Sequence, residues 1–135
     1  MAVFVDTGIF VAANNKSDKN HARATELMKQ ALEGKFGEIF TSDYVIDESI
    51  TTALARTRDH RIAISTGSFI IESPRIRKIF TDGSDFESAW AKFQKLGKKP
   101  LSFTDCISLS HIDKKKIEKI MSFDSDFDGL VARIP

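Results

Sequence analysis

The chain opens with an uninterrupted apolar run that ends at a carboxylate. Residues 2–5 read Ala-Val-Phe-Val and are followed by Asp6, Thr7 and Gly8. Apolar residues without alternation are typical of a strand buried on both faces, as in the middle of a parallel sheet. Ligands of open α/β sheets bind just beyond the carboxyl ends of the central strands. Asp6 therefore lies where a functional site is expected.

Strand-like and helix-like patterns alternate along the rest of the chain. Apolar and β-branched runs predict strands at 2–5, 38–41, 75–80, 117–123 and 130–134. Helical periodicity and capping signals predict helices at 9–13, 43–58 and 61–71. They also predict a helix from the cap Asp18 to residue 32, one from Ser84 through Phe93 with Gly97 past its end, and one from Ser102 through Ile112. This alternation predicts an α/β fold, in which one domain over residues 1–135 has a parallel sheet between two layers of helices.

The composition of the strands indicates where they lie in the sheet. Strands 2–5 and 117–123 are the most apolar, and they end at Asp6 and Asp124. If these strands are central neighbours, the two carboxylates lie side by side at the point where the loops diverge. Strand 75–80 carries several charges, which suits an edge strand.

Local signals mark the starts of the helices. Ser42 and Asp59 are expected to cap the third and fourth helices, and Asp18 the second. Residues 84–87 read Ser-Asp-Phe-Glu, which is a capping-box pattern for the fifth helix. Trp90, in that helix, is expected in the core together with Phe93.

Composition limits the class of protein. The chain has 135 residues, 41% of them hydrophobic and 29% charged, which is ordinary for a folded domain. The net charge of +1 does not by itself indicate a nucleic-acid binder. No apolar run is long enough to cross a bilayer, and the single cysteine, Cys106, cannot form an internal disulfide. A reducing cytoplasm is the expected location.

Acidic residues form the constellation that could carry chemistry. The candidates are Asp6, Glu48, Asp105 and Asp124, with Asp126 as a fifth. Hard divalent cations such as Mg²⁺ prefer oxygen ligands, and a bound ion can activate water and stabilise the charge of a phosphodiester under attack. The sequence contains no phosphate-binding Gly-Lys-Ser/Thr loop, no glycine fingerprint and no Cys/His cluster with zinc spacing.

Each acid also has a purely structural interpretation. Asp6 could cap the helix that follows it, and Asp105 lies three residues after Ser102, as in a capping box. However, Asp105 shares a helical face with apolar residues, where a carboxylate is unusual unless it is paired or binds metal. Asp124 belongs to an Asp-rich turn. Spacing alone does not choose among Asp43, Asp47 and Glu48 in the third helix.

Basic residues cluster near the end of the third helix. Arg56, Arg58, His60 and Arg61 lie close together in sequence. A solvated surface is the default interpretation, and a contact with an RNA backbone through the arginines is the functional one.

Four segments together resemble a PIN domain of the kind found in VapC-type toxins. They are Val3–Thr7, Thr41–Glu48, Leu101–Asp105 and Ser122–Phe127. By this resemblance, the metal-site acids are Asp6, Glu48, Asp105 and Asp124. Thr7 and Thr104 match hydroxyl positions beside these acids, and Asp126 falls where some members have a further acid. Only the resemblance selects Glu48 over Asp47.

The resemblance implies more than the residues do. It implies a five-stranded parallel sheet in the order 3-2-1-4-5 and a Mg²⁺- or Mn²⁺-dependent endoribonuclease that cuts single-stranded or loop RNA. It further implies a homodimer, and for the toxins a small antitoxin that blocks the cleft.

Three other functions compete with this prediction. The chain could be a PIN-like RNA-processing nuclease without an antitoxin, or a non-catalytic RNA-binding or scaffold domain. It could also be a different Mg²⁺-binding doubly wound protein. An Asp-nucleophile phosphatase would need a second Asp where Gly8 stands, and a phosphotransfer receiver would need an acceptor Asp after the third strand, near Asp82.

Overall fold

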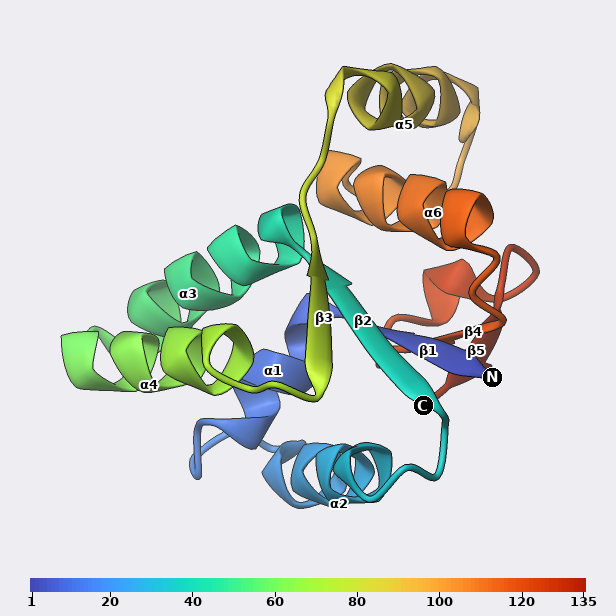
Figure 1. Ribbon diagram of the computed structural model, residues 1–135. Coiled ribbons are helices and arrows are strands. Elements are labelled where there is room, and N and C mark those ends of the chain that lie inside the picture. The colour runs from blue at the N-terminus through green and yellow to red at the C-terminus, as the bar shows by residue number, and fades with distance from the viewer.

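The computed structural model describes all 135 residues, in which strands alternate with helices in an α/β fold (Figure 1). The strands are β1 (Ala2–Val5), β2 (Glu38–Ser42), β3 (Ile76–Ile79), β4 (Lys119–Met121) and β5 (Ala132–Ile134). The α-helices are α1 (Thr7–Ala13), α2 (His21–Leu32), α3 (Asp43–Thr57), α4 (His60–Ile71), α5 (Gly83–Lys95) and α6 (Phe103–Lys115), and a short 3₁₀ helix, η1, spans Ser125–Phe127. No helix has both the length and the apolar content needed to span a bilayer.

The sheet has the predicted strand order, with every neighbouring pair parallel. The order is β3-β2-β1-β4-β5, so β1 is central and pairs with both β2 and β4. The charged strand β3 lies at one edge, as its composition predicted. Helices α1 to α4 lie on one side of the sheet and α5 with α6 on the other (Figure 1). This arrangement confirms the three-layer α/β prediction.

The β1 strand is the centre of the core because helices cover both of its faces. Val3, Phe4 and Val5 are fully buried, and they belong to one hydrophobic cluster with residues of α1, β2, β4 and η1. Val5 aligns with Met121 of β4, and the Asp6 N–H donates to the Met121 carbonyl at 3.0 Å. The ends of β1 and β4 are therefore held together.

The β4 strand is shorter than the sequence predicted. Ile117 was expected to begin it, but its N–H donates to the Ile112 carbonyl and so closes the end of α6. Lys116, between them, has the left-handed conformation (φ 55°) common just after a helix. These residues serve the helix terminus, which leaves the strand only Lys119–Met121.

Two of the four predicted helix starts are correct. The Ser42 hydroxyl accepts a hydrogen bond from the Val45 N–H, and the Asp59 carboxylate accepts one from the Arg61 N–H. Asp18 was wrongly expected to cap α2. Its carboxylate accepts from the Asn20 N–H within a turn, and the helix begins only at His21.

The capping box of α5 lies earlier than predicted. Asp82 is the capping residue, and its carboxylate accepts from the Asp85 N–H at 2.9 Å. Asp85 reciprocates by accepting from the Asp82 N–H at 3.1 Å. The Ser84–Glu87 assignment was therefore wrong, because the helix already begins at Gly83 and the Asp82 carboxylate, two residues before Ser84, caps its first turn.

The prediction that Trp90 and Phe93 belong to the core was also wrong. Trp90 is 51% exposed and Phe93 40% exposed, because the buried face of α5 carries the small Ala89 and the network residue Asp85 instead. The two rings stack on each other and lie against Phe103 at the start of α6. They form a surface cluster.

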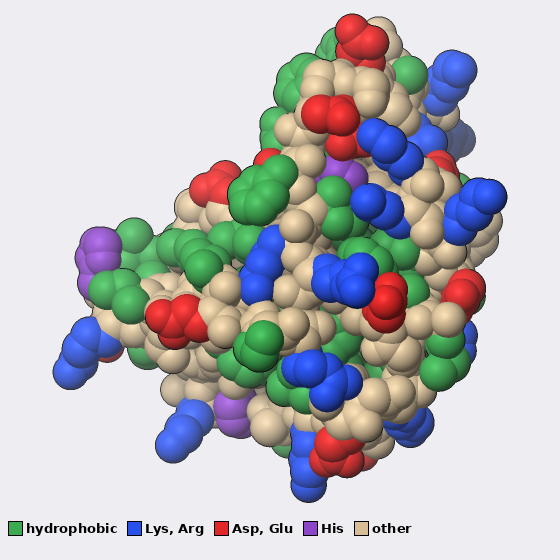
Figure 2. Space-filling model, viewed as in Figure 1, with side chains coloured by type: hydrophobic (Ala, Val, Ile, Leu, Met, Phe, Trp, Pro, Cys, Tyr) green, Lys and Arg blue, Asp and Glu red, His purple; other side chains and the backbone are tan.

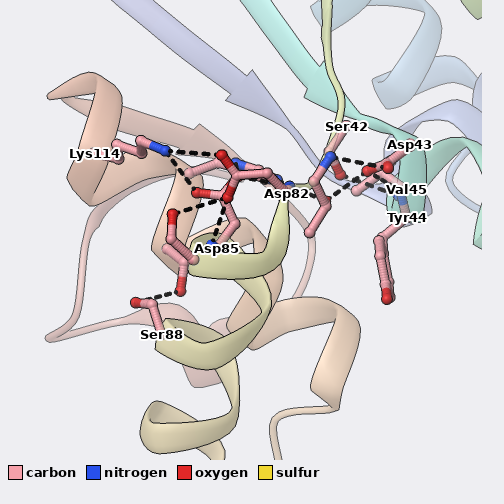
Figure 3. A network of polar contacts seen from close by, with 12 residues as sticks. Ser42, Asp43, Tyr44, Val45, Asp82, Asp85, Ser88 and Lys114 are labelled. Atoms are coloured by element: carbon pink, nitrogen blue, oxygen red, sulfur yellow. Dashed lines mark hydrogen bonds and ion pairs between the residues drawn. The ribbon is translucent and has the colours of Figure 1, made fainter.

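A partly buried polar network joins α5 and α6 to the start of α3 (Figure 3). Thr81 Oγ1 donates to the Asp43 carboxylate at 2.7 Å and lies 3.0 Å from His111 Nε2. Because the hydroxyl proton goes to the carboxylate, Nε2 must carry a proton and donate to Thr81. Lys114 of α6 donates to Asp85 of α5 at 3.2 Å.

The charge of the surface is mixed. Figure 2 shows lysine and arginine side chains spread over the face that carries the β3 edge and the end of α6, interspersed with acidic side chains. This pattern agrees with the net charge of +1. Attraction of a polyanion therefore depends on local groups and not on the charge of the whole molecule.

His111 should make the protein less stable in mild acid. The ring is 1% exposed, its Nδ1 has no partner, and burial lowers the pKa of the imidazole. The unfolded chain therefore binds a proton that the folded chain resists, so stability falls as the pH drops through about 6.5. From pH 7.5 to 5.5 this residue should cost at most about 1.4 kcal/mol.

Urea unfolding of His111→Gln at the two pH values measures this effect. The variant should show a smaller loss between them than the parent protein does. His60→Gln serves as the matched control, because His60 is exposed and should leave the pH dependence unchanged. An unchanged pH dependence in His111→Gln would contradict the assignment.

Candidate active site

An acidic cleft opens at the carboxyl edge of the sheet. Its volume is about 300 Å³, and it is lined by Asp6, Thr7, Gly8, Val11, Glu48, Thr52, Arg56, Ser102, Asp105 and Asp124. The four acids proposed from the sequence all line this cleft. They come from the ends of β1 and β4, from α3 and from the first turn of α6. The topology thus brings together carboxylates far apart in the chain.

Asp6 is the most buried of these acids. It is 7% exposed, its Oδ2 accepts a hydrogen bond from Ser122 Oγ at 2.7 Å, and its Oδ1 is buried without a partner. Its side chain makes no capping hydrogen bond to α1, so the capping interpretation was wrong. Burial raises the pKa of Asp6 to about 7, and the nearby charges of Asp105 and Glu48 add to this shift.

Ser122 was missed as a site residue by the sequence analysis. Its fully buried hydroxyl donates to Asp6 and accepts a hydrogen bond from the Asp124 N–H at 3.0 Å. One hydroxyl therefore fixes both strand-end acids. The available signal was a polar residue at the end of an apolar strand, directly after Met121.

Asp105 combines the two interpretations that the sequence left open. It forms a capping box with Ser102, in which Oδ2 accepts from the Ser102 N–H at 2.9 Å and the Asp105 N–H donates to Ser102 Oγ at 3.1 Å. It also lines the cleft. Burial raises the pKa of Asp105, and Glu48 and Asp124 raise it further. The capping hydrogen bond holds Oδ2 of Asp105 and so fixes the position of the carboxylate at the cleft.

The structure separates the three acids of α3. Asp43 accepts hydrogen bonds from Thr81 in the polar network (Figure 3), and Asp47 is exposed and accepts from Thr51. Glu48 alone of the three lines the cleft, and its carboxylate makes no hydrogen bond to the protein. The side chain of Glu48 is therefore free to turn toward a ligand.

Asp124 and Asp126 have different surroundings. Asp124 lines the cleft and accepts from the Asp126 N–H at 2.9 Å, which caps η1. Asp126 is not among the residues that line the cleft. Its carbonyl accepts a hydrogen bond from Lys99 Nζ at 2.9 Å, so this lysine fixes the loop.

The two proposed threonines are placed differently as well. Thr7 lines the cleft, and its Oγ1 is buried without a partner. Thr104 is not among the lining residues, and its carbonyl accepts a hydrogen bond from Ser108 Oγ within α6. Of the two, only Thr7 presents an unsatisfied oxygen at the cleft.

The arginine cluster is divided by the end of α3. Arg56 lines the cleft and forms an ion pair with Asp18 at 3.7 Å. Arg58 ends the helix in a left-handed conformation, and Arg61 pairs with its own capping residue, Asp59. Arg56 is therefore the one member of the cluster in contact with the site.

Comparison with known proteins identifies the family. A family model described as the PIN domain matches residues 3–131. The chain belongs to the PIN domain family. This match confirms the family predicted from the sequence.

Several relatives of this PIN domain are VapC proteins. The chain is 29% identical over 131 residues to a VapC ribonuclease of Archaeoglobus fulgidus, with 94% of this chain and 80% of that protein covered. The crystal structure of Mycobacterium tuberculosis VapC20, a sarcin-ricin loop cleaving toxin, matches with a TM-score of 0.83 and 27% identity over 95% of this chain and 94% of that one. VapBC2 of Rickettsia felis, solved with a promoter DNA fragment, matches with a TM-score of 0.69 and 17% identity over 99% and 98%, and supports the fold alone.

The donors in the cleft suit a hard divalent cation. Asp6 Oδ1 and Thr7 Oγ1 are buried oxygens without partners, and burial together with neighbouring carboxylates raises the pKa values of Asp6 and Asp105. A cation would relieve both the unsatisfied oxygens and the repulsion. The side chains do not form a group of three that could hold an ion as they stand, so binding would require them to turn inward.

Replacing Asp6 by Asn should stabilise the metal-free protein at high pH. Because the pKa of Asp6 is raised to about 7, the folded chain holds a proton that the unfolded chain releases near pH 4, so this residue lowers stability progressively as the pH rises from about 4 to about 7. Below about pH 4 the side chain is neutral in both states. At pH 8 the gain should be on the order of 2 kcal/mol, less than the full ionisation penalty of about 4 kcal/mol, because the new amide N–H groups lack partners.

Thermal melts in chelator at pH 8 and pH 5 test this prediction. The gain in melting temperature should shrink at pH 5. Asp47→Asn is the control, since Asp47 is exposed and outside the cleft. Destabilisation of Asp6→Asn at pH 8 would mean that the carboxylate has a structural role and that its burial is not strained.

Proposed function

We propose that this PIN domain protein is a divalent-metal-dependent endoribonuclease and the toxin of a toxin–antitoxin pair. The observation that carries the proposal is the cleft in which Asp6, Glu48, Asp105 and Asp124 meet. Its similarity to a VapC ribonuclease and to the VapC20 toxin supports the same conclusion. We further propose Mg²⁺ or Mn²⁺ as the metal and a homodimer as the working form.

The four acids would hold the ion, with Thr7 Oγ1 beside them. When bound, the metal supplies an activated water and charge stabilisation for a phosphodiester. Asp6 is held in position by Ser122, and Asp105 by its capping box, so both enter the reaction already oriented. Glu48 lacks a protein hydrogen bond and is the acid best placed to accept a proton from water. Arg56, at the edge of the cleft, would contact a phosphate.

The substrate we propose is single-stranded or loop RNA. The cleft has a volume of only about 300 Å³, and a flexible strand enters such a space more readily than a duplex does. The relative VapC20 is a toxin that cleaves the sarcin-ricin loop. An unpaired stretch in a larger RNA is therefore the expected target.

An antitoxin would act at the same cleft. Its most direct means is to place an arginine or lysine among the carboxylates, because a charge-assisted hydrogen bond would replace the metal ion. The structural neighbours include a toxin–antitoxin complex from Klebsiella pneumoniae and VapBC2 of Rickettsia felis. Inhibitor and divalent metal should accordingly oppose each other.

The other candidate functions have less support. A scaffold domain would not need four acids around one cleft, several of them at a cost in stability. In a receiver, Asp82 would be the acceptor, but it caps α5. An RNA-processing nuclease without an antitoxin shares the same site and differs only in its partner.

A matched pair of neighbouring acids tests the enzyme proposal. With Mn²⁺, the parent protein should cut a labelled single-stranded RNA faster than a duplex of the same sequence. Glu48→Gln should lower the rate by on the order of a hundredfold or more, because the site loses both a ligand and a proton acceptor. Asp47→Asn, one residue away but outside the cleft, should retain the parent rate.

Gel analysis of the cleavage products gives the rates, and chelator provides the blank. Equal loss in the two variants would argue against the cleft as the active site. Faster cutting of the duplex would refute the substrate class, and full activity in chelator would refute metal dependence.

A further inference from the structure

A second cavity adjoins the acidic cleft. It lies between the α1–α2 loop and the residue before Asp124, has a volume of about 570 Å³, and is lined by Gly8, Asn15, Ser17, Asp18, Lys19, Asn20, Arg56 and Phe123. We call it the loop pocket. Gly8 and Arg56 line both this pocket and the acidic cleft, so the two spaces adjoin at these residues. A polymer bound in the cleft would extend into the loop pocket.

We propose that the loop pocket binds a nucleotide of the RNA next to the phosphate that is cut. This inference rests on the proposed ribonuclease function. In this proposal the loop pocket, which lies outside the four acids, positions the RNA strand. It does so through one stacked base and one or two phosphate contacts.

Cations in the loop pocket suit a phosphate. Lys19 is exposed and makes no ion pair or hydrogen bond, and Arg56 has only the ion pair with Asp18 at 3.7 Å, longer than a hydrogen bond. Asp18 is the pocket's one carboxylate, and its oxygens face Arg56 and the Asn20 N–H. The acidic cleft, in contrast, has four carboxylates. The loop pocket therefore places positive charge directly beside the acidic cleft.

An aromatic ring and free amides suit a base. Phe123 is half-buried and lines the loop pocket, where its ring lies beside Gly8. Single-stranded nucleic acids bind by stacking bases on such rings. The Asn20 side chain makes no hydrogen bond in the structure, and in Asn15 only Oδ1 is engaged, by the Ser17 N–H. Both amides can therefore donate to a base edge.

Phe123 also has a fixed position relative to the acids. It stands between Ser122, which binds Asp6, and Asp124, whose N–H donates to the Ser122 hydroxyl. A base stacked on Phe123 would consequently set the register of the strand relative to the carboxylates. Binding of the neighbouring nucleotide would in this way place the reacting phosphate at the carboxylates.

Binding and cleavage measurements on matched variants test the proposal. In a Glu48→Gln background with Mn²⁺, the affinity for a labelled single-stranded RNA is measured by fluorescence anisotropy. Adding Phe123→Leu should weaken binding about tenfold, the typical effect of one lost stacked base. Phe36→Leu is the control, because Phe36 is also half-buried but lines neither cavity.

Two lysines in the same loop form a second pair. Lys19→Ala should weaken binding several-fold and reduce the salt dependence by about one phosphate contact. Lys16→Ala removes an equally exposed charge that does not line the loop pocket, and it should have little effect. Equal losses of RNA affinity in the two variants would show that both lysines act only through non-specific electrostatic attraction. That result would overturn the assignment of Lys19 to a phosphate contact.

An abasic substrate isolates the stacking contact. In the cleaving protein, removing the base at one position beside the cut should raise KM about as much as Phe123→Leu does, and the two changes together should cost no more than either alone. If cleavage is normal but no variant and no abasic position matters, the loop pocket proposal is refuted and the ribonuclease function stands.

Other outcomes distinguish failure of the ribonuclease function from failure of the nucleotide-binding role of the loop pocket. RNA that is neither bound nor cut, with Mn²⁺ shown to be bound, would overturn the ribonuclease function together with the loop pocket. Variants that keep full RNA affinity but lose a protein partner would assign the pocket to that protein and reject the nucleotide. Mn²⁺ affinity should be unchanged in Phe123→Leu and Lys19→Ala, and a loss there would indicate distortion of the acids instead.

Discussion

The hydrogen bond from Ser122 to Asp6 joins the two central strands at the point where the site forms. It holds a carboxylate whose other oxygen is buried and unpaired, at the end of the most buried strand of the sheet. Such a group opposes folding once it ionises. The free energy lost at Asp6 is offset by hydrophobic burial in the core around β1, where Phe4 and its neighbours are fully buried. The rigid sheet therefore maintains an electrostatic strain that a bound cation would relieve.

Two other acids of the cleft also combine a structural hydrogen bond with a place in the site. Asp105 caps α6 and Asp124 caps η1, so each carboxylate has a structural partner and a free oxygen for the cleft. A capping hydrogen bond restricts the side chain, which reduces the ordering cost of a ligand. Glu48 lacks such a partner and retains its freedom. The cleft thus contains three acids held by hydrogen bonds and one, Glu48, without such a bond, which suits the proton-accepting role proposed for Glu48 besides its place among the metal ligands.

The sequence predicted those parts of the site that depend on strand ends. Asp6 and Asp124 follow apolar runs, and parallel neighbours must bring their ends together, so their meeting could be inferred from residues alone. The choice of Glu48 could not, because Asp43, Asp47 and Glu48 all suit a helix surface, and only the packing of α3 against α1 and α6 decides which faces the cleft. Ser122 and the exposure of Trp90 also depend on tertiary neighbours that local patterns do not specify.

Arg56 links the chemistry of the acids with the recognition of a polyanion. Four carboxylates would repel RNA if no cation stood near them, yet the net charge of the molecule is only +1. Arg56 lines both the acidic cleft and the loop pocket, and its only ion pair, with Asp18 at 3.7 Å, is longer than a hydrogen bond. A phosphate can therefore compete for Arg56, whereas it cannot approach the unneutralised acids. Under the proposed function, productive binding would require both the metal among the acids and the arginine beside them, and cleavage would be confined to strands that occupy the two spaces together.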